Sequence, residues 1–464
     1  MGAPYTISMV ALPVLLAGCA LSGTHPDLGK VAKPAFWEEA GASTSNESSL
    51  PASWWQALHD PVLDHLMPLA RFASVEQALA RVDEARAQLG QQSAATQPQV
   101  HGGVNVQRGI EQADGFHLMG RAGPSLQLNW EIDLWGRLAY GQRAAEQRSF
   151  QRAAEAELAQ LLAQAELAEL VHQERTCRRL AELGKADQES WTYTLHVQQE
   201  RLRLGALSPQ GFARQQEKAA TQRAQLSATE GQCRSLRHAV RALVGLPPSE
   251  LSEALALEQA TWTPPATLRP EQPASLLLRH PQLRAASAAA DAAAQDLGAA
   301  QAARLPSLSL SALLSHQWLR VLGMNSEQES WSVGTQLSAS LWDGGANGAR
   351  VDAAHARLRQ SIARLDQTLR QTVRDVESAL ARQHAAQQTQ LALQQQVQAN
   401  LRSWQASQQA AAAGRLSPLD LEDAARQHRA AEQSLLTAQR DLSLAWIGVV
   451  KAAGHAPLHL EPSL

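Results

Sequence analysis

The sequence contains a stretch from Ala349 to Ala413 that has neither Gly nor Pro and consists mainly of Ala, Leu, Gln and Arg, which favour the helical conformation. Its apolar residues recur at spacings of three and four, which predicts one helix with a single apolar stripe. The stripe comprises Leu358, Ile362, Leu365, Leu369, Val373, Val376 and Leu380. At 1.5 Å per residue the helix is roughly 95 Å long, and charges such as Arg370 and Glu377 on its other faces exclude a membrane span. It therefore needs partner helices along its length.

Most of the chain is a tandem repeat with an offset of 207 to 209 residues. Leu89-Gly90 recurs as Leu297-Gly298, Leu134-Trp135 as Leu341-Trp342, and Gly205-Ala206-Leu207-Ser208-Pro209 as Gly414-Arg415-Leu416-Ser417-Pro418. We place the first repeat at residues 73–245 and the second at 277–454. Each repeat is predicted to contain a helix, two strands, a long helix and a shorter returning helix.

The element boundaries follow from Gly, Pro and the apolar periodicity. The strands are predicted at about 99–108, 122–135, 306–318 and 331–342, the first long helix at about 137–204, and the returning helices at 209–244 and 418–453. The segments outside the repeats are a tether at 19–50, linkers at 51–72 and 246–276, and a C-terminal tail at 455–464.

The clearest strand alternates apolar with polar residues between Ser125 and Leu134. A strand of about ten residues with one apolar side is typical of a transmembrane β-strand, and a soluble half-buried hairpin is the alternative. Because two repeats supply four strands and membrane barrels begin at about eight, a membrane location requires an oligomer. A dimer gives eight strands with a filled interior, whereas a trimer gives twelve with room for water. The polar residues then line the lumen: Gln127, Asn129, Glu131 and Asp133.

The N-terminus contains a candidate lipidation signal. An apolar run too short for a stable membrane helix, Ile7 to Leu16, leads directly into Leu16-Ala17-Gly18-Cys19. This motif resembles the bacterial lipobox, which implies a signal peptide at 1–18, acylation of Cys19 and, with Ala20 next, release to the outer membrane. The first nine residues lack the usual Lys or Arg, so an unlipidated signal or a misplaced start codon is the alternative.

Other chemistries have little support. The net charge of −3 offers no basic field for nucleic acid. No nucleophile elbow, phosphate loop or paired-cysteine motif occurs, and Pro457 separates His455 from His459, so we expect no enzyme, no metal site and no cofactor. Cys177 and Cys233 lie in helical stretches and form either a disulfide or two small packing residues, of which packing is the favoured interpretation.

The ordered motifs resemble the TolC family of outer-membrane factors, in particular its lipoprotein branch of NodT and OprM-like proteins. The resemblance rests on Trp54-Trp55, Asn129-Trp130-Glu131-Ile132-Asp133-Leu134-Trp135-Gly136-Arg137, Arg279-His280-Pro281, Leu341-Trp342-Asp343-Gly344-Gly345 and Leu416-Ser417-Pro418-Leu419-Asp420-Leu421. It implies an α+β membrane protein that forms, as a homotrimer, a 12-stranded outer-membrane β-barrel and a long periplasmic α-helical barrel, ringed by an equatorial domain built from 51–72, the linker and the tail.

The same resemblance implies a channel that exports drugs or other small molecules together with a periplasmic adaptor and an inner-membrane pump, usually of the RND type. The adaptor contacts are expected at the helical tips: Gly205, Leu207, Ser208, Gly414, Leu416 and Ser417. Asp420 and Asp423 match the aspartate ring with which family members close the periplasmic end. Three copies of each carboxylate around a narrow pore would repel one another and favour cations. Either acid can also simply complement the helix N-terminus.

The repeats differ in two places, and one rival function stays open. The first repeat has Phe72-Ala73 where the second has His280-Pro281, and it has Gln210 and no acid after its tip. The rival is a periplasmic lipoprotein adaptor or coiled-coil scaffold, which also needs an anchor and long helices. It predicts one helical hairpin inserted in soluble β-domains and not a tandem repeat with paired amphipathic strands.

Overall fold

The computed structural model describes residues 37–39, 53–112, 116–257, 265, 267–268, 273–321 and 324–455. The predicted signal peptide, Cys19 and most of the tether and tail lie outside these residues. The chain divides into two compact units, one with residues 92–144 and 293–358 and one with 37–91, 145–292 and 359–455 of the described part. Each unit is described by itself.

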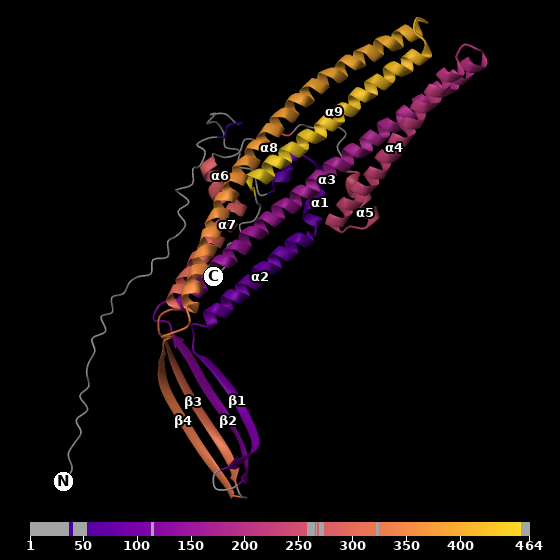
Figure 1. Ribbon diagram of the computed structural model, residues 1–464. Coiled ribbons are helices and arrows are strands. Elements are labelled where there is room, and N and C mark those ends of the chain that lie inside the picture. Colours follow the sequence, from indigo (N-terminus) through magenta and orange to yellow (C-terminus); the bar gives the residue numbers. More distant parts are fainter. Residues whose placement is uncertain are drawn as a thin grey trace, which may run out of the picture. The chain divides into compact units, whose positions relative to one another are not determined.

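The first unit contains a four-stranded antiparallel sheet in the order β1-β2-β3-β4 (Figure 1). The strands are β1 (Gln99–Gln112), β2 (Phe116–Ile132), β3 (Ser307–Val321) and β4 (Met324–Ser338). Leu297 and Leu358 belong to a small apolar cluster of the helical residues beside it. Each repeat therefore supplies one β-hairpin, and β2 of the first pairs with β3 of the second.

The strands are longer than the sequence pattern predicts and end at different residues. β1 and β3 extend beyond 108 and 318, and β4 begins at Met324, seven residues before the predicted start, in the polar run up to Ser330. Pairing between backbones continues here because it does not require apolar side chains. Strand β4 also ends at Ser338, so that Leu341 and Trp342 are almost fully exposed beyond it.

The second unit is helical. The helices are α1 (Pro61–Leu69), α2 (Ala73–Ala94), α3 (Arg137–Arg203), α4 (Pro209–Val244), α5 (Pro248–Leu255), α6 (Pro273–Arg279), α7 (Pro281–Ala302), α8 (Ala346–Ala412) and α9 (Pro418–Ala453), with a 3₁₀ turn η2 (Trp54–Leu58). α2, α3, α7 and α8 have their remaining residues in the first unit. The tandem helical hairpins predicted from the sequence, α3–α4 and α8–α9, are confirmed (Figure 1).

The core of the helical unit lies where the short elements meet the long helices. Trp54 of η2 and Trp446 of α9 are both buried, with ring centroids 6.2 Å apart. Asp60 caps α1 by accepting a hydrogen bond from the Val62 N–H at 3.0 Å, and it pairs with Arg175 of α3 at 2.7 Å. This pair joins the segment predicted as equatorial to the long helix.

Part of the predicted tether is docked. Trp37 is buried in the same core, and the backbone N–H groups of Glu38 and Glu39 donate to the carboxylate of Glu377 at 2.9 and 3.2 Å. The Ser- and Gly-rich composition gives no sign of this contact, because its partner is one carboxylate on α8, far along the chain.

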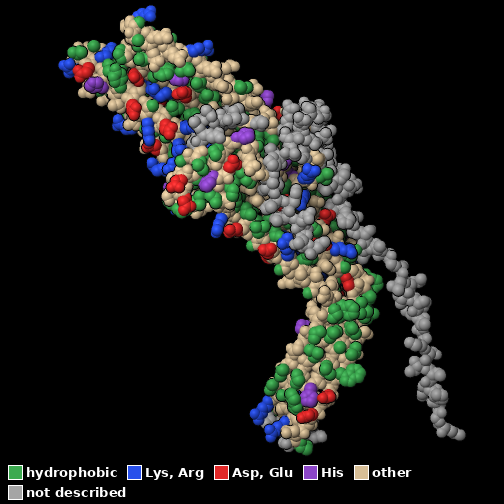
Figure 2. Space-filling model, turned by 180° about the vertical axis from the view of Figure 1, so that it is seen from behind, with side chains coloured by type: hydrophobic (Ala, Val, Ile, Leu, Met, Phe, Trp, Pro, Cys, Tyr) green, Lys and Arg blue, Asp and Glu red, His purple; other side chains and the backbone are tan. Residues whose placement is uncertain are grey.

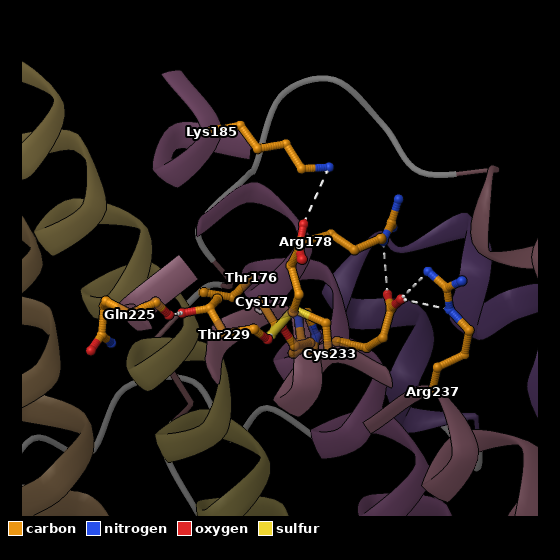
Figure 3. Close-up of a disulfide and its surroundings, with 11 residues drawn as sticks. Thr176, Cys177, Arg178, Lys185, Gln225, Thr229, Cys233 and Arg237 are labelled. Carbon is orange, nitrogen blue, oxygen red and sulfur yellow. Dashed lines mark hydrogen bonds and ion pairs between the residues drawn. A yellow bond between two sulfur atoms is a disulfide. The ribbon is translucent and has the colours of Figure 1, made fainter. Parts of the chain in front are cut away.

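The favoured interpretation of the two cysteines is wrong, because Cys177 of α3 and Cys233 of α4 form a disulfide (Figure 3). Beside it, the buried carboxylate of Glu174 pairs with Arg178 of the same helix and Arg237 of α4, at 2.9 and 3.2 Å. Helical spacing alone does not show that two cysteines on different helices face each other at the same height. The first hairpin is therefore crosslinked.

Candidate functional site

The two faces of the sheet differ in polarity. Residues that pair across neighbouring strands share a face, so the register assigns every side chain to one face or the other. One face carries Val100, Val104, Val106, Ile110, Leu126, Leu128, Trp130, Ile132, Leu308, Leu310, Leu314, Trp318, Trp331, Val333 and Leu337. The other carries Gln99, His101, Asn105, Gln107, Arg121, Ser125, Gln127, Asn129, Glu131, Ser309, Ser311, Ser315, Gln317, Gln328, Ser330 and Gln336.

The apolar face is open to the surroundings of the single chain. Val104 is 77% exposed and Trp331 is 79% exposed, and hydrophobic side chains cover much of this part of the molecule in Figure 2. Leu313 and Met324 are exposed apolar residues of the opposite face. A continuous exposed apolar surface of this kind marks a lipid or protein contact. None of the described helices is long and apolar enough to cross a membrane.

The four residues predicted to line a lumen do not all behave alike. Gln127 and Asn129 share the polar face, where the amide of the first donates to the second at 3.3 Å. Glu131 is on that face too, paired with Arg137 at 2.6 Å. Asp133 lies one residue beyond the end of β2, and its carboxylate accepts from the Ala139 N–H at 2.8 Å. Asp133 thus stabilises the start of α3.

Both helical tips have the same local structure. Gly205 and Gly414 adopt positive φ angles of 74° and 70°, which Gly tolerates without strain. After each of them a Ser caps the returning helix: Ser208 accepts from the Gly211 N–H at 3.1 Å and Ser417 from the Asp420 N–H at 3.2 Å. The tip glycines and serines are exposed, whereas Leu207 and Leu416 are half-buried.

The two acids after the second tip have local partners. The Asp420 carboxylate accepts a hydrogen bond from the Ser417 hydroxyl at 2.7 Å, in addition to the bond that its N–H donates, so Asp420 takes part in the cap of α9. Asp423 pairs with Arg426 in the same helix and keeps a side chain that is 62% exposed. Both carboxylates therefore stay available to a neighbouring chain while they stabilise the first turn of their own helix.

A network between α9 and α3 holds the second hairpin against the first repeat, and the sequence reasoning missed it. Arg426 donates to Ser190 and Thr194 at 2.6 and 3.1 Å, and its guanidinium lies 4.2 Å from the ring centroid of Trp191. One turn further on, Arg429 of α9 pairs with Asp187 of α3 at 2.5 Å. Only the sequence spacing of Asp423 and Arg426 could have suggested part of this network.

Two histidines of the helical unit, His172 and His280, are buried. Burial lowers the pKa of His172 from 6.5 to about 4, although the nearby Asp60 opposes the shift. Burial likewise lowers the pKa of His280 to about 4. For Asp60, burial raises the pKa, but the hydrogen bond and charge of Arg175 outweigh it and the net pKa is lowered. At neutral pH, His172 is therefore a neutral imidazole beside the Asp60–Arg175 ion pair, and His280 is neutral as well.

An apolar cavity of about 270 Å³ opens on the helical unit. Phe150 of α3, Leu277 and Leu278 of α6, and Leu369 of α8 contribute to its lining, and Leu278 is 63% exposed. Among the residues that the structure describes, no cluster of His, Cys, Asp and Glu is arranged to hold a metal ion.

Known proteins share the repeat organisation of this chain. The model of the family "Outer membrane efflux protein" matches residues 68–246 and 273–455, one match for each repeat. The chain belongs to this family. The resemblance to TolC-type outer-membrane factors is thereby confirmed, and with it the role of an outer-membrane efflux channel.

Individual relatives match most of the chain. Nodulation protein T of Rhizobium leguminosarum bv. trifolii is 24% identical over 464 residues, which is 98% of each chain. The probable outer membrane lipoprotein SilC of Salmonella typhimurium is 23% identical and covers 85% of this chain and 87% of its own. The Campylobacter jejuni CmeC outer membrane channel has the same fold, with a TM-score of 0.80 at 18% identity over 92% of this chain and 93% of that one.

Proposed function

We propose that three copies of the chain form one export channel, in which three four-stranded sheets close a twelve-stranded barrel. The observation that carries this proposal is the separation of an apolar face from a polar face by the sheet register. The apolar face meets lipid and the polar face lines a water-filled lumen with Gln127, Asn129 and Glu131. Four strands leave β1 and β4 with unpaired edges, and a neighbouring copy satisfies both.

The apolar cavity of the helical unit supports the same assembly. Leu278 at its mouth would remain in water in a single chain, and burial of one such side chain contributes about 2 kcal/mol. A second copy of the chain covers the cavity in the proposed trimer. The long helices of three copies then form a tube in the periplasm, because each has a narrow apolar stripe that needs partners.

The channel acts with two partner proteins, an adaptor and a pump. A periplasmic adaptor docks at the exposed tips, Gly205 to Ser208 and Gly414 to Ser417, and an inner-membrane pump, of the RND type, delivers drugs or other small molecules. Acylation of Cys19 anchors each chain to the outer membrane, a proposal that the lipoprotein relative SilC supports. Asp420 and Asp423 form the periplasmic gate, where three copies of each carboxylate hold water and favour cations.

Two adjacent residues of β1 allow a matched test of the barrel. Val104 lies on the apolar face and Asn105 on the polar face, and both are exposed in the single chain. In outer-membrane vesicles, we expect Asn105→Cys to react with a membrane-impermeant maleimide and Val104→Cys to react only with a lipid-soluble one. Cys177 and Cys233 do not interfere because they are paired.

Equal labelling of both cysteines by the impermeant reagent would overturn the barrel proposal. Native mass spectrometry of the detergent-extracted protein supplies the second readout, in which we expect a trimer with acyl chains on every protomer. A monomer would instead support the adaptor or scaffold.

A further inference from the structure

Near the end of the apolar face lies a row with two arginines, one row before the Ile110–Leu118 pair. The register pairs Arg108 of β1 with Gly120 of β2, and Gly120 with Arg320 of β3. Both arginines therefore lie on the same face as Val106 and Trp318. With strands about 4.8 Å apart, their Cα atoms are about 10 Å from each other. Gly120 between them has no side chain, and a Cβ added there would meet only the Cβ of Arg320, at 3.9 Å.

Neither arginine has a partner that accounts for it. Both are exposed, and neither forms an ion pair with any residue whose side chain the structure describes. Two acids of β4 share this face: Glu329 lies 3.4 Å from His316, and Glu327 lies in the row next to Arg320. With respect to the side chains that the structure describes, the row thus carries two unpaired positive charges, with the carboxylate of Glu327 in the next row.

The position of this row along the strand matches a membrane surface. From Ile132 to Gly120 the strand rises about 40 Å, and at a tilt of about 40° this becomes roughly 30 Å of height, close to the hydrocarbon thickness of a bilayer. Trp130, near the other end, donates its indole N–H to the Thr96 carbonyl at 3.0 Å, and Trp318 lies in the row before the arginines. Trp130 and Trp318 thus lie at the two levels where tryptophans mark membrane interfaces, and Trp331 lies between them in the row of Leu126.

We propose that Arg108 and Arg320 bind a phosphate group of a phosphorylated glycolipid in the outer leaflet, with Gly120 leaving room for it. The proposal rests on the proposed function, because it needs the apolar face to meet lipid. Guanidinium groups bind phosphate through paired, charge-assisted hydrogen bonds. Two of them on the same face of the sheet can bind one phosphate together. Without a bound anion, two positive charges at the edge of the hydrocarbon layer would be energetically unfavourable.

The experiment measures binding of lipid A, a glycolipid with two phosphate groups, to the purified trimer in detergent by native mass spectrometry. We expect Arg108→Gln/Arg320→Gln to weaken binding by at least about tenfold. Arg121→Gln is the matched control, because Arg121 lies one residue from Gly120 on the polar face and should leave binding unchanged. Glu327→Gln should leave binding equal or tighter, since it removes the neighbouring negative charge.

The lipid itself supplies the second comparison. Lipid A without its phosphates should bind the unmodified trimer as weakly as complete lipid A binds the double variant. Equal binding of both lipids, or an equal loss with Arg121→Gln, would overturn the proposal, and saturation by inorganic phosphate alone would assign the site to free phosphate. A double variant that still forms trimers and passes the Val104 and Asn105 labelling test, yet binds lipid A normally, would refute this site while leaving the barrel intact.

Discussion

The two helical hairpins have the same secondary structure but are held together differently. In α3–α4, Cys177 and Cys233 form a disulfide, and Gly211 occupies the third helical position after the tip. In α8–α9, the corresponding positions are Ala386, Leu442 and Asp420, so there is no crosslink and an acid follows the tip. A repeated sequence has thus produced one hairpin with a covalent crosslink and one without, in which Trp404 of α8 stacks on His428 of α9.

The contacts of the second hairpin are of a kind that can be broken and remade. Arg426 and Arg429 attach α9 to α3 through hydrogen bonds, ion pairs and a cation–π contact, which are weaker than a covalent bond and depend on charge. The proposed gate acids are on this second hairpin. We therefore propose that the crosslinked hairpin α3–α4 is a fixed support against which α8–α9 moves. The following variants test these two roles.

The largest effect is expected from loss of the crosslink. The disulfide closes a loop with a sequence separation of 56, for which chain entropy predicts a stabilisation of about 4 kcal/mol. We expect Cys177→Ala/Cys233→Ala to lower the thermal unfolding midpoint and to increase amide exchange in α4. Reduction of the native protein should reproduce the change, whereas amide exchange in α9 should stay the same. Equal loosening of both hairpins would show that the disulfide stabilises the bundle as a whole.

The helical architecture was predictable because its signals are local. The tip motifs, Gly then Leu-Ser-Pro, place a positive φ angle, a capping Ser and a Pro at the first helical position within five residues, so α4 and α9 begin and end at the predicted positions. The strands were less predictable, because ladder pairing carries β4 back through a polar run to Met324. Which residues share a face was nevertheless readable from the alternation around Trp130.

The contacts that distinguish the hairpins were not predictable, since each depends on a neighbour distant in sequence. Cys177 and Cys233 meet only because α3 and α4 pack in one particular register. Arg426 of the second repeat donates to Ser190 of the first, and the periodicity of α9 does not distinguish Arg426 from its neighbours. The acids after the tip were found from the resemblance, and the hydrogen bond from the Ser417 hydroxyl shows that Asp420 also takes part in the cap of α9.

The second-largest effect is expected at Arg426, whose side chain is only 13% exposed. Replacement by Ala leaves Ser190 and Thr194 without their donor and removes the cover of Trp191, which should cost about 2 kcal/mol. We expect faster amide exchange at the start of α9 and a higher single-channel conductance. Arg415→Ala at the exposed tip is the control for loss of charge. An unchanged conductance with faster exchange would separate the network from gating.

A smaller, pH-dependent difference is expected between the beginnings of the two repeats. His280 caps α7 by accepting from the Gln282 N–H at 3.2 Å and is buried, whereas the first repeat has Phe72 at this place. The pKa of His280 is about 4 in the folded state and near 6.5 when unfolded. Above pH 6.5 neither state binds the proton, and between 6.5 and 4 only the unfolded state does. Stability should therefore fall with falling pH, by about 1.4 kcal/mol per unit.

The variant His280→Asn isolates this contribution, because the Asn side-chain oxygen can accept the same N–H without titrating. Denaturant unfolding at pH 7 and pH 5 should show a smaller difference for the variant than for the unmodified protein. His172 titrates in the same window and keeps the remaining pH dependence in both. An unaltered pH dependence in the variant would mean that His280 accepts a proton without unfolding.

The smallest change in stability, but one decisive for the comparison, is expected from Asp420→Ala/Asp423→Ala. The Ser417 cap of α9 stays, because Ser417 accepts from the backbone N–H of residue 420. The loss of two charges near the helix N-terminus, with the exposed side-chain bonds to Ser417 and Arg426, costs only about 1 kcal/mol. Single-channel conductance should nevertheless rise, since the proposed gate loses its carboxylates.

Gly211→Asp is the reciprocal variant, because it places an acid at the matching position of the crosslinked hairpin. If the acids act by position around the pore, Gly211→Asp should lower the conductance of the double variant again. If they act only because α9 can move, an acid on the fixed hairpin should leave that conductance unchanged.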